Sequence, residues 1–283
     1  MSMIIRYRFD PLLHADARPN IVGGGTQKIT DEQNTDNTIS RTITLSEYPS
    51  EVCFGNLGEV SKSIIEVLDY PMNPTMTSFC HLFDGCVNLI NVDCVTWNTS
   101  NISDFRYCFR NCSSLTNLDV HNWLIKNLAN GSEMFSGCTQ LKSLNLTNWR
   151  TTVASPNFTN FLSNCKELEE LNLSHWNISN GFTITDMLTG NDSLRHVKMV
   201  DCSETTINKL ITQLPTNVDD AKLYVSLNIH EEFINNLPAG WKIAKGGVII
   251  NPYFLNKPLK DITIKNCKVK HIHIGETKVF FYK

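Results

Sequence analysis

Apolar residues recur along this chain with a long and nearly constant period. A phenylalanine or leucine is followed three positions later by cysteine, and successive cysteines lie 26, 26 and 27 residues apart. A decayed copy, with asparagine in place of cysteine, follows 26 residues further on. Units that repeat in this way build solenoids, because one unit cannot bury its own apolar face. We call the units the first to fifth coils; their pairs are Phe83 with Cys86, Phe109 with Cys112, Phe135 with Cys138, Leu162 with Cys165, and Leu188 with Asn191.

Each coil continues with an apolar pattern of the form L-x-x-L-x-L. This spacing predicts a short strand that follows a turn, and strands of successive coils would pair in parallel as one sheet. In four coils a tryptophan comes three residues after the strand, and we expect these large rings to stack from coil to coil. The clearest strand positions are Leu115, Leu118 and Val120; Leu141, Leu144 and Leu146; and Leu168, Leu171 and Leu173, and the tryptophans are Trp97, Trp123, Trp149 and Trp176.

The position before each cysteine holds only glycine or asparagine, the residues that best tolerate a left-handed backbone. A left-handed residue after a short apolar segment is typical of the end of a helix, and Ser132 or Thr185 could begin a helical turn upstream. The pattern therefore predicts an α/β solenoid, similar to leucine-rich repeats, with a parallel β-sheet, short helical turns and small β modules at both ends. The predicted corners are Gly85, Asn111, Gly137, Asn164 and Gly190.

The combination of M-F-x-G-C, L-x-x-L-x-L and N-x-x-W resembles the BspA-type leucine-rich repeat. The polar segment after the tryptophan, Asn98 to Phe105, is similar to the D-T-S-N-V-T-D-M of that family. The resemblance covers residues 61–214. It implies a solenoid of the kind found in bacterial and protist surface proteins, which are mostly adhesins or binding proteins.

The segments outside the repeat predict smaller elements. Residues 1–60 suit a β module with strands at 4–9 and 38–45, and with an exposed loop that includes 23–25 and 31–37. Residues 207–211 predict an amphipathic capping helix. The segment 215–245 is expected to extend the cap, with a strand at 222–225 and a helix at 231–237. Residues 246–283 predict a β-hairpin module at 269–280, which resembles the V-x-x-I-x-x-G-x-x-x-V-[FYW] module of bacteriophage tail and other virion proteins.

Composition narrows the class of protein. The net charge is −3 and 19% of residues are charged, so the chain lacks the basic character of a nucleic-acid binder. Residues 257–283 carry seven lysines against Asp261 and Glu276, a net of +5, which leaves −8 for the rest. No apolar run reaches the length of a signal peptide or a membrane span, so we expect a protein that is neither exported by the standard route nor inserted in a membrane. The ten cysteines are expected to be reduced.

No motif in the sequence predicts catalysis or a cofactor. Walker, H-E-x-x-H and G-x-S-x-G strings are absent, and Gly23 to Gly25 lacks the context of a phosphate loop. His271 and His273 lie on one face of a predicted strand, where alternating polar residues are expected without any metal. The paired carboxylates of a glycosidase can lie far apart in sequence, so an enzyme of that class stays a third alternative. We expect no enzyme, no metal and no cofactor.

The outward side of the predicted sheet is the candidate binding site. Side chains that flank the apolar strand positions form polar columns of amides, hydroxyls and carboxylates, which suit a glycan or a peptide backbone. The same columns also suit the solvated face of a spacer, and both interpretations stay open. The candidate residues are Asn91, Asp93, Asn117, Asp119, His121, Ser143, Asn145, Thr147, Glu170, Asn172 and Ser174.

Together these observations predict a non-enzymatic structural protein of a bacteriophage virion, on the tail or a fibre, made in the cytoplasm of a bacterial host. It would contact other virion proteins and a glycan or protein of the host surface, and it would be a homo-oligomer. The alternative is a leucine-rich-repeat adhesin of the bacterial cell surface.

Overall fold

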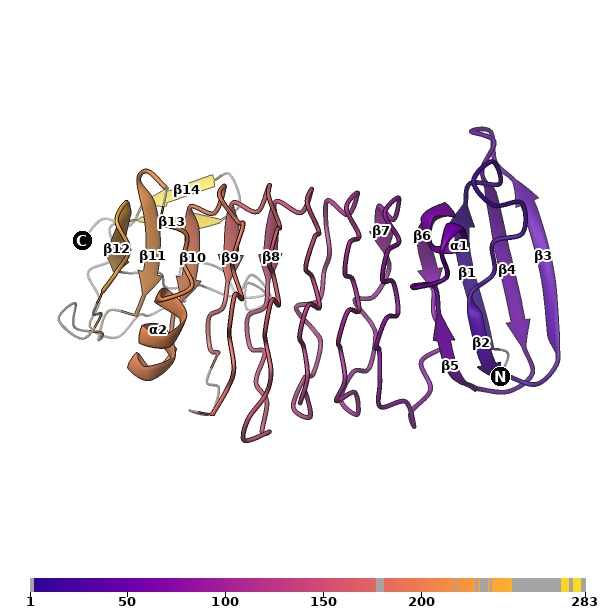
Figure 1. Cartoon of the computed structure of the whole chain (residues 1–283), viewed down its shortest axis with the longest axis horizontal. Helices are drawn as coiled ribbons and strands as arrows, with labels where there is room; N and C mark the ends of the chain where they lie inside the picture. Colours follow the sequence, from indigo (N-terminus) through magenta and orange to yellow (C-terminus); the bar gives the residue numbers. More distant parts are fainter. Residues whose placement is uncertain are drawn as a thin grey trace. The chain divides into compact units, whose positions relative to one another are not determined.

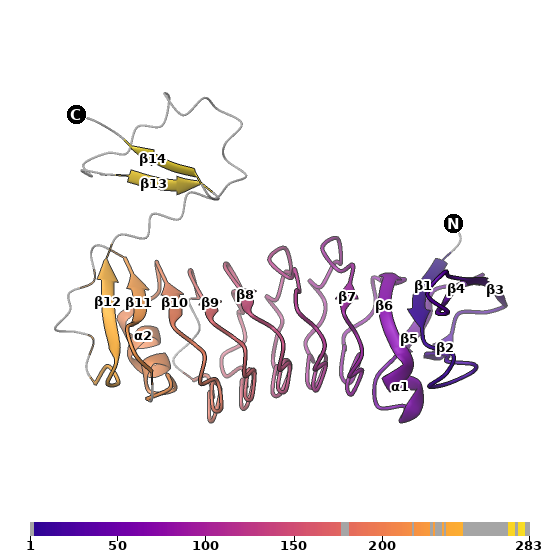
Figure 2. The same ribbon diagram turned by 90° about the horizontal axis from the view of Figure 1, so that it is seen from above.

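The computed structural model describes residues 3–176, 181–216, 218–226, 229, 234 and 236–245, and the backbone of 271–274 and 277–280. The chain divides into two compact units, Met1–Gly247 and Val248–Lys283. The first unit is a stack of coils between two β-sheets (Figures 1 and 2). In the second unit, β13 (His271–Ile274) pairs antiparallel with β14 (Thr277–Phe280), which confirms the predicted hairpin.

An antiparallel sheet begins the first unit and turns parallel where it meets the solenoid. Its strand order is β3-β4-β1-β6-β7. The strand β6 pairs antiparallel with β1 on one side and parallel with β7 on the other. It therefore belongs both to the N-terminal sheet and to the stack of coils. The bounds are β1 Met3–Phe9, β3 Gln27–Gln33, β4 Ile39–Leu45, β6 Ile64–Asp69 and β7 Asn91–Val92.

The two strands predicted near the N-terminus are confirmed as β1 and β4, but part of the predicted loop at 31–37 is wrong. Residues Gln27–Gln33 form the edge strand β3, paired along its whole length with β4. Its side chains are exposed apart from the half-buried Ile29. A strand at an open edge needs no apolar face and gains from charges that discourage pairing with other chains, so its sequence is polar like that of a loop. A smaller sheet pairs β2 (Asn20–Gly23) with β5 (Pro49–Cys53), and α1 (Glu59–Ser63) precedes β6.

A five-stranded parallel sheet, in the order β12-β11-β10-β9-β8, covers the other end of the unit. Its strands follow the predicted apolar positions, and β11 confirms the strand expected at 222–225. The capping helix α2 (Glu204–Ile211) is also confirmed; the Ser203 hydroxyl accepts a hydrogen bond from the Thr206 amide at 3.2 Å. The helix expected at 231–237 lies mostly outside the described residues. The remaining bounds are β8 Ser143–Asn145, β9 Glu170–Asn172, β10 His196–Met199, β11 Ala221–Val225 and β12 Trp241–Lys245.

The predicted helical turns of the repeat are not confirmed, so the chain is a β-solenoid with little helix. In the second coil, Cys108 N–H donates to the Phe105 carbonyl and Cys112 N–H to the Phe109 carbonyl, both at 3.2 Å. The third residue of each turn, Tyr107 and Asn111, has a positive φ of 60° and 58°. This is the geometry of consecutive type II turns.

The predicted left-handed corners are all confirmed, but a second left-handed set lies four residues earlier. The corners Gly85, Asn111, Gly137, Asn164 and Gly190 have φ between 58° and 79°. The second set prevents a helix, which requires right-handed dihedrals throughout, and its mixed composition gives no signal in the sequence. Its members are His81, Tyr107, Glu133, Asn160 and Asp186.

These turns form a hydrogen-bonded ladder of their own, which we call the turn side. Alternate amides point along the stack: Phe109 N–H donates to the Met134 carbonyl and Asn111 N–H to the Ser136 carbonyl, both at 2.8 Å. A charged cluster joins the first three coils here. Arg110 forms a two-pronged pair with the buried Asp84, at 2.8 and 2.7 Å, and reaches Glu133 at 3.3 Å.

The core between the two sides is built from repeated rings and thiols. Trp97, Trp123 and Trp149 stack with centroids 5.9 and 6.3 Å apart, which confirms the predicted stacking for three of the four tryptophans. The Trp176 ring contacts Phe158 and Phe161. The cysteines of the first four coils are buried, and the Cys112 thiol donates to the Phe83 carbonyl of the preceding coil at 3.2 Å. The same contact recurs for Cys138 and Cys165. All nine cysteines within the described residues are free, and the repeated thiol–carbonyl contact gives a structural reason for cysteine at this position.

Candidate ligand-binding face

The strand register places the candidate residues in two outward columns, which together we call the polar face. Ser143 pairs with Glu170 and Asn145 with Asn172, and the columns continue through His196 and Lys198 of β10. Of the eight candidates in these columns, seven are exposed and Asn172 is half-buried. They are Asn91, Asn117, Ser143 and Glu170 in one column, and Asp93, Asp119, Asn145 and Asn172 in the other.

The third predicted column does not share this exposure. Ser174 is fully buried, so its prediction as an outward residue is wrong. Its backbone carbonyl accepts from Asn148, and its hydroxyl accepts from the Val200 amide at 3.3 Å. Here the chain has already left the strand for the turn toward Trp176, and the alternation of sides no longer holds. Thr147 and His121, at the equivalent positions, are half-buried.

The parallel sheet opens at the second coil. One sheet ends at β7 and the other begins at β8, and residues 115–120 between them belong to neither. Among the described residues, the backbone amides and carbonyls of Asn117 and Leu118 form no hydrogen bond with either neighbouring coil. Just beyond the opening, the Trp149 indole N–H donates to the Val120 carbonyl at 3.1 Å and ties the second coil to the third.

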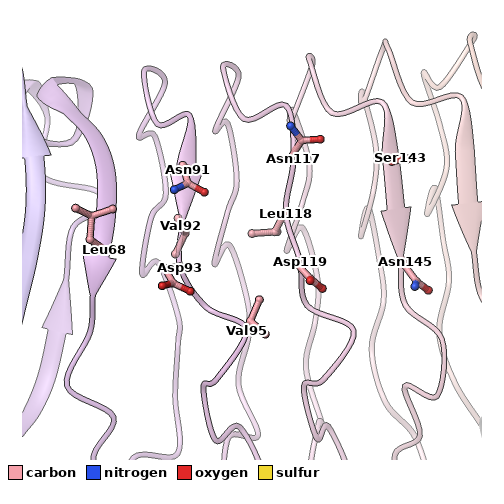
Figure 3. Close-up of a pocket in the computed structure, with 10 residues that line it drawn as sticks. All are labelled: Leu68, Asn91, Val92, Asp93, Val95, Asn117, Leu118, Asp119, Ser143 and Asn145. Carbon is pink, nitrogen blue, oxygen red and sulfur yellow. The ribbon is translucent and has the colours of Figure 1, made fainter. Parts of the chain in front are cut away.

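Leu118 lies at this opening, packed against the margin of the core and not inside it as the repeat pattern predicts. It is only partly buried, and Figure 3 shows its side chain pointing toward the coil that carries Val92. The apolar side chain thus occupies space between two coils that elsewhere are joined by backbone hydrogen bonds.

A shallow recess of about 480 Å³ lies over the opening (Figure 3). Its lining combines carboxylates, amides and a hydroxyl with a few apolar side chains, and none of the described residues in it is basic. A smaller recess of about 170 Å³ follows over β8 and β9. The main recess is lined by Leu68, Asn91, Val92, Asp93, Val95, Asn117, Leu118, Asp119, Ser143 and Asn145.

The recess brings together six of the predicted site residues from three coils, but it leaves out Glu170, Asn172 and the third column. The apolar margin, formed by Leu68, Val95 and Leu118, was missed by sequence reasoning. Leu68 lies in β6, ahead of the first cysteine-containing coil, and the spacing of the coils does not place it beside Asp93.

Charge changes sign along the polar face. The coils around the recess carry Asp93 and Asp119. At the far end, Lys198 continues their column, and Lys222 and Lys242 continue the other, in register with His196. Part of this basic charge is neutralised, because Lys198 lies 3.8 Å from Glu170 and Lys242 lies 2.8 Å from Asp220. The lysines were not predicted: Lys198 lies in the decayed fifth coil, and Lys222 and Lys242 follow it.

The described part of the chain holds no group of three or more histidine, cysteine or acidic residues arranged to bind a metal ion. His271 and His273 lie in β13, where only the backbone is described. None of the helices described is long and apolar enough to cross a bilayer.

Burial raises the pKa of the repeat cysteines, to about 12 for Cys165 and Cys94. These thiols therefore stay protonated at neutral pH, when they can donate to the carbonyls described above. They are unsuited to act as nucleophiles or metal ligands, since both roles require the thiolate.

Comparison with known proteins supports the assignment of a repeat protein and does not identify a ligand. Residues 77–201 match a family described as "Mycoplasma protein of unknown function, DUF285". No curated protein and no solved structure matches the chain. The family match and the stacked coils agree that residues 77–201 are part of a repeat solenoid, and neither gives support to the resemblance with bacteriophage tail modules.

Proposed function

We propose that this chain is a non-enzymatic binding protein that holds a polar ligand on its polar face, at the recess over the second coil. The single observation that carries this proposal is the opening of the parallel sheet. No backbone hydrogen bond joins Asn117 or Leu118 to a described neighbouring coil, whereas the equivalent residues of the third and fourth coils lie in the paired strands β8 and β9. Polar side chains surround this opening.

A ligand in the recess would pair with backbone groups that form no hydrogen bond to a described neighbouring coil. Exposed backbone amides and carbonyls at the edge of a sheet are a common means of holding an extended peptide, and they supply affinity while neighbouring side chains supply specificity. The amides of Asn91, Asn117 and Asn145 can each donate and accept. This mixture suits a ligand that is rich in hydrogen-bonding groups.

The lining gives no support to catalysis. A nucleophile needs a base within hydrogen-bonding reach, and the one hydroxyl in the lining, that of Ser143, has no histidine, lysine or cysteine beside it there. Asp93 and Asp119 are both exposed on the open surface of the recess.

For the biological setting we propose a bacteriophage virion, on the tail or a fibre, where a homo-oligomer would contact other virion proteins and a glycan or protein of the host surface. The pattern of residues 269–280, folded as the hairpin β13–β14, supports this setting. The second candidate is an adhesin of the bacterial cell surface. The match to a family described from Mycoplasma favours that alternative.

Binding can be tested with the fluorescently labelled full-length chain and cells of the source bacterium. We expect saturable binding that is lost when Asn91→Ala and Asn117→Ala are combined. The matched control is Asn122→Ala, an exposed asparagine outside the recess. Equal binding by the double variant and the control would contradict a ligand site in the recess.

The setting can be tested by immunogold labelling of a phage-producing culture with antibody against residues 61–214. Gold at a defined position on virus particles would support the virion. Gold on the bacterial envelope beside unlabelled particles would overturn the virion and favour the adhesin.

A further inference from the structure

Two carboxylates stand side by side at the opening. Asp93 follows β7, and Asp119 occupies the same position one coil later; Figure 3 shows them at the same level on neighbouring coils. Further along the same column the positions are taken by Asn145 and Asn172, which are neutral and paired in register.

Like charges at facing positions of neighbouring strands destabilise the pairing. The two aspartates coincide with the one place in the coil stack where the described parallel strands are interrupted. Mutual repulsion between the carboxylates therefore gives a physical reason for the opening. A cation placed between the two carboxylates would offset that repulsion.

None of the described residues places a cation between the two carboxylates. Among them, no lysine, arginine or histidine lines the recess. Asp119 is in contact with the His121 ring on its own coil, whereas Asp93 forms no ion pair with any described residue. One carboxylate is thus available on the open side of the recess.

Apolar side chains border the carboxylates. Leu68, Val95 and Leu118 line the same recess. Long basic side chains bury their methylene stem against apolar surface and keep the charged end among polar groups. A lysine or arginine side chain fits this combination better than a sugar ring does, because the described lining has no aromatic side chain on which a ring would stack.

The far end of the polar face restricts where such a ligand can lie. Lys198, Lys222 and Lys242 continue the two columns, and they would repel a basic ligand that extended past the fourth coil. A cationic segment is therefore favoured at the recess and disfavoured beyond it.

From these observations we propose that the occupant of the recess is a basic segment of a partner protein, with a lysine or arginine side chain that ends between Asp93 and Asp119. This inference rests on the proposed function, since it identifies the chemistry of the ligand held at the same site.

The probe is a fluorescein-labelled octapeptide with alternating serine and lysine, and its control is the same peptide with acetylated lysines. Binding to the full-length chain would be followed by fluorescence anisotropy.

We expect Asp93→Asn and Asp119→Asn each to weaken binding by about threefold to fivefold, as for exposed ion pairs. The matched control, Glu169→Gln, removes an exposed carboxylate outside the recess and should leave affinity unchanged. Acetylation or 0.5 M salt should weaken binding in the unaltered chain, since salt screens exposed charges.

Other outcomes separate this inference from the function on which it rests. Equal affinity for all variants would overturn the inference, because the peptide would then bind the acidic surface without using the recess. Binding of neutral N-acetylglucosamine oligomers that is lost in the combined Asn91→Ala and Asn117→Ala variant, with no binding of the lysine peptide, would overturn the basic ligand and keep the proposed site. Loss of bacterial-cell binding in Asp93→Asn but not in Glu169→Gln would support both.

Discussion

The two sides of the second coil are built from one stretch of chain, yet they behave differently. On the turn side, Phe109 and Asn111 donate hydrogen bonds to the third coil at 2.8 Å. On the strand side, residues 115–120 belong to neither sheet. The comparison shows that the turns, stacked rings and buried thiols are enough to hold one coil on the next. The strand side can therefore depart from regular pairing and expose groups for binding.

The largest expected loss of stability comes from removing the Trp149 side chain, whose indole bonds to the second coil beside the opening. Trp149→Ala would delete a fully buried ring, its stacking on Trp123 and its bond to the Val120 carbonyl. We expect a loss of about 4 kcal/mol in the free energy of unfolding, as for other buried aromatic residues. Urea unfolding followed by circular dichroism would measure it. Leu124→Ala, at a leucine that is 62% exposed, is the control and should change stability little; a similar loss in both would contradict the assigned core.

Alkaline pH tests the buried thiols of the turn side. Cys165 has a pKa of about 12 in the folded chain, whereas an unfolded cysteine titrates near 8.5. The contribution of the thiol to the free energy of unfolding is fully present below the unfolded pKa. This contribution is lost as pH rises toward 12, because the unfolded chain then releases a proton that the folded chain keeps. At pH 10.5 this loss is about 3 kcal/mol for one thiol.

The measurement is urea unfolding at pH 8 and pH 10.5 in reducing buffer. Cys165→Ala should be less stable than the unaltered chain at pH 8 and should lose less on going to pH 10.5. An identical pH dependence in the two proteins would show that this thiol is not buried as described.

Substitution of two glycines on the turn side can distinguish the cost of a left-handed backbone from the cost of a steric clash. Gly85 and Gly137 share a φ of 76°, but a Cβ on Gly85 would meet nothing within 4 Å, whereas one on Gly137 would lie 2.5 Å from the Asn111 amide oxygen. We expect Gly85→Ala to cost about 1 kcal/mol from the left-handed backbone alone, and Gly137→Ala to cost more. Thermal unfolding of the two variants would compare them, and equal losses would mean that the neighbouring coil yields without cost.

The smallest expected effect on stability comes from the strand side. Asp93→Asn removes the facing like charges, and it should leave the free energy of unfolding nearly unchanged while it favours pairing of the second coil with the first. Amide hydrogen exchange at Leu118 and Asp119 should become slower. Unchanged exchange in this variant would argue that Leu118, and not charge, keeps the coils apart.

The sequence predicted the repeated features well and the exceptions poorly. The period, the stacked tryptophans and the left-handed corners follow from residue types that few other positions accept, such as Gly137 beside Cys138. The second left-handed set did not follow, because Tyr107 and Glu133 have no intrinsic preference for that backbone; the hydrogen bonds of the neighbouring coil impose it. For this reason helical turns were predicted where consecutive β-turns occur.

The candidate site was predicted in part for the same reason. Alternation along a strand correctly placed Asn91, Asp93, Asn117 and Asp119 outward, since that rule is local. It failed at Ser174, where the strand has ended. The opening of the sheet, the position of Leu118 and the contribution of Leu68 depend on contacts between coils, and a pattern within one coil carries no information on them.

Hydrogen exchange of backbone amides by NMR, on the unaltered full-length chain, tests the central comparison most directly. We predict strong protection for Phe109 and Asn111 on the turn side of the second coil, and for Leu146 at the end of β8, whose amide donates to the Asn172 carbonyl at 2.9 Å. Leu118 and Asp119 should exchange many times faster. Equal protection of Leu118 and Asn111 would contradict the account, since it would mean that the sheet is closed at the second coil and that no backbone groups are free for a ligand.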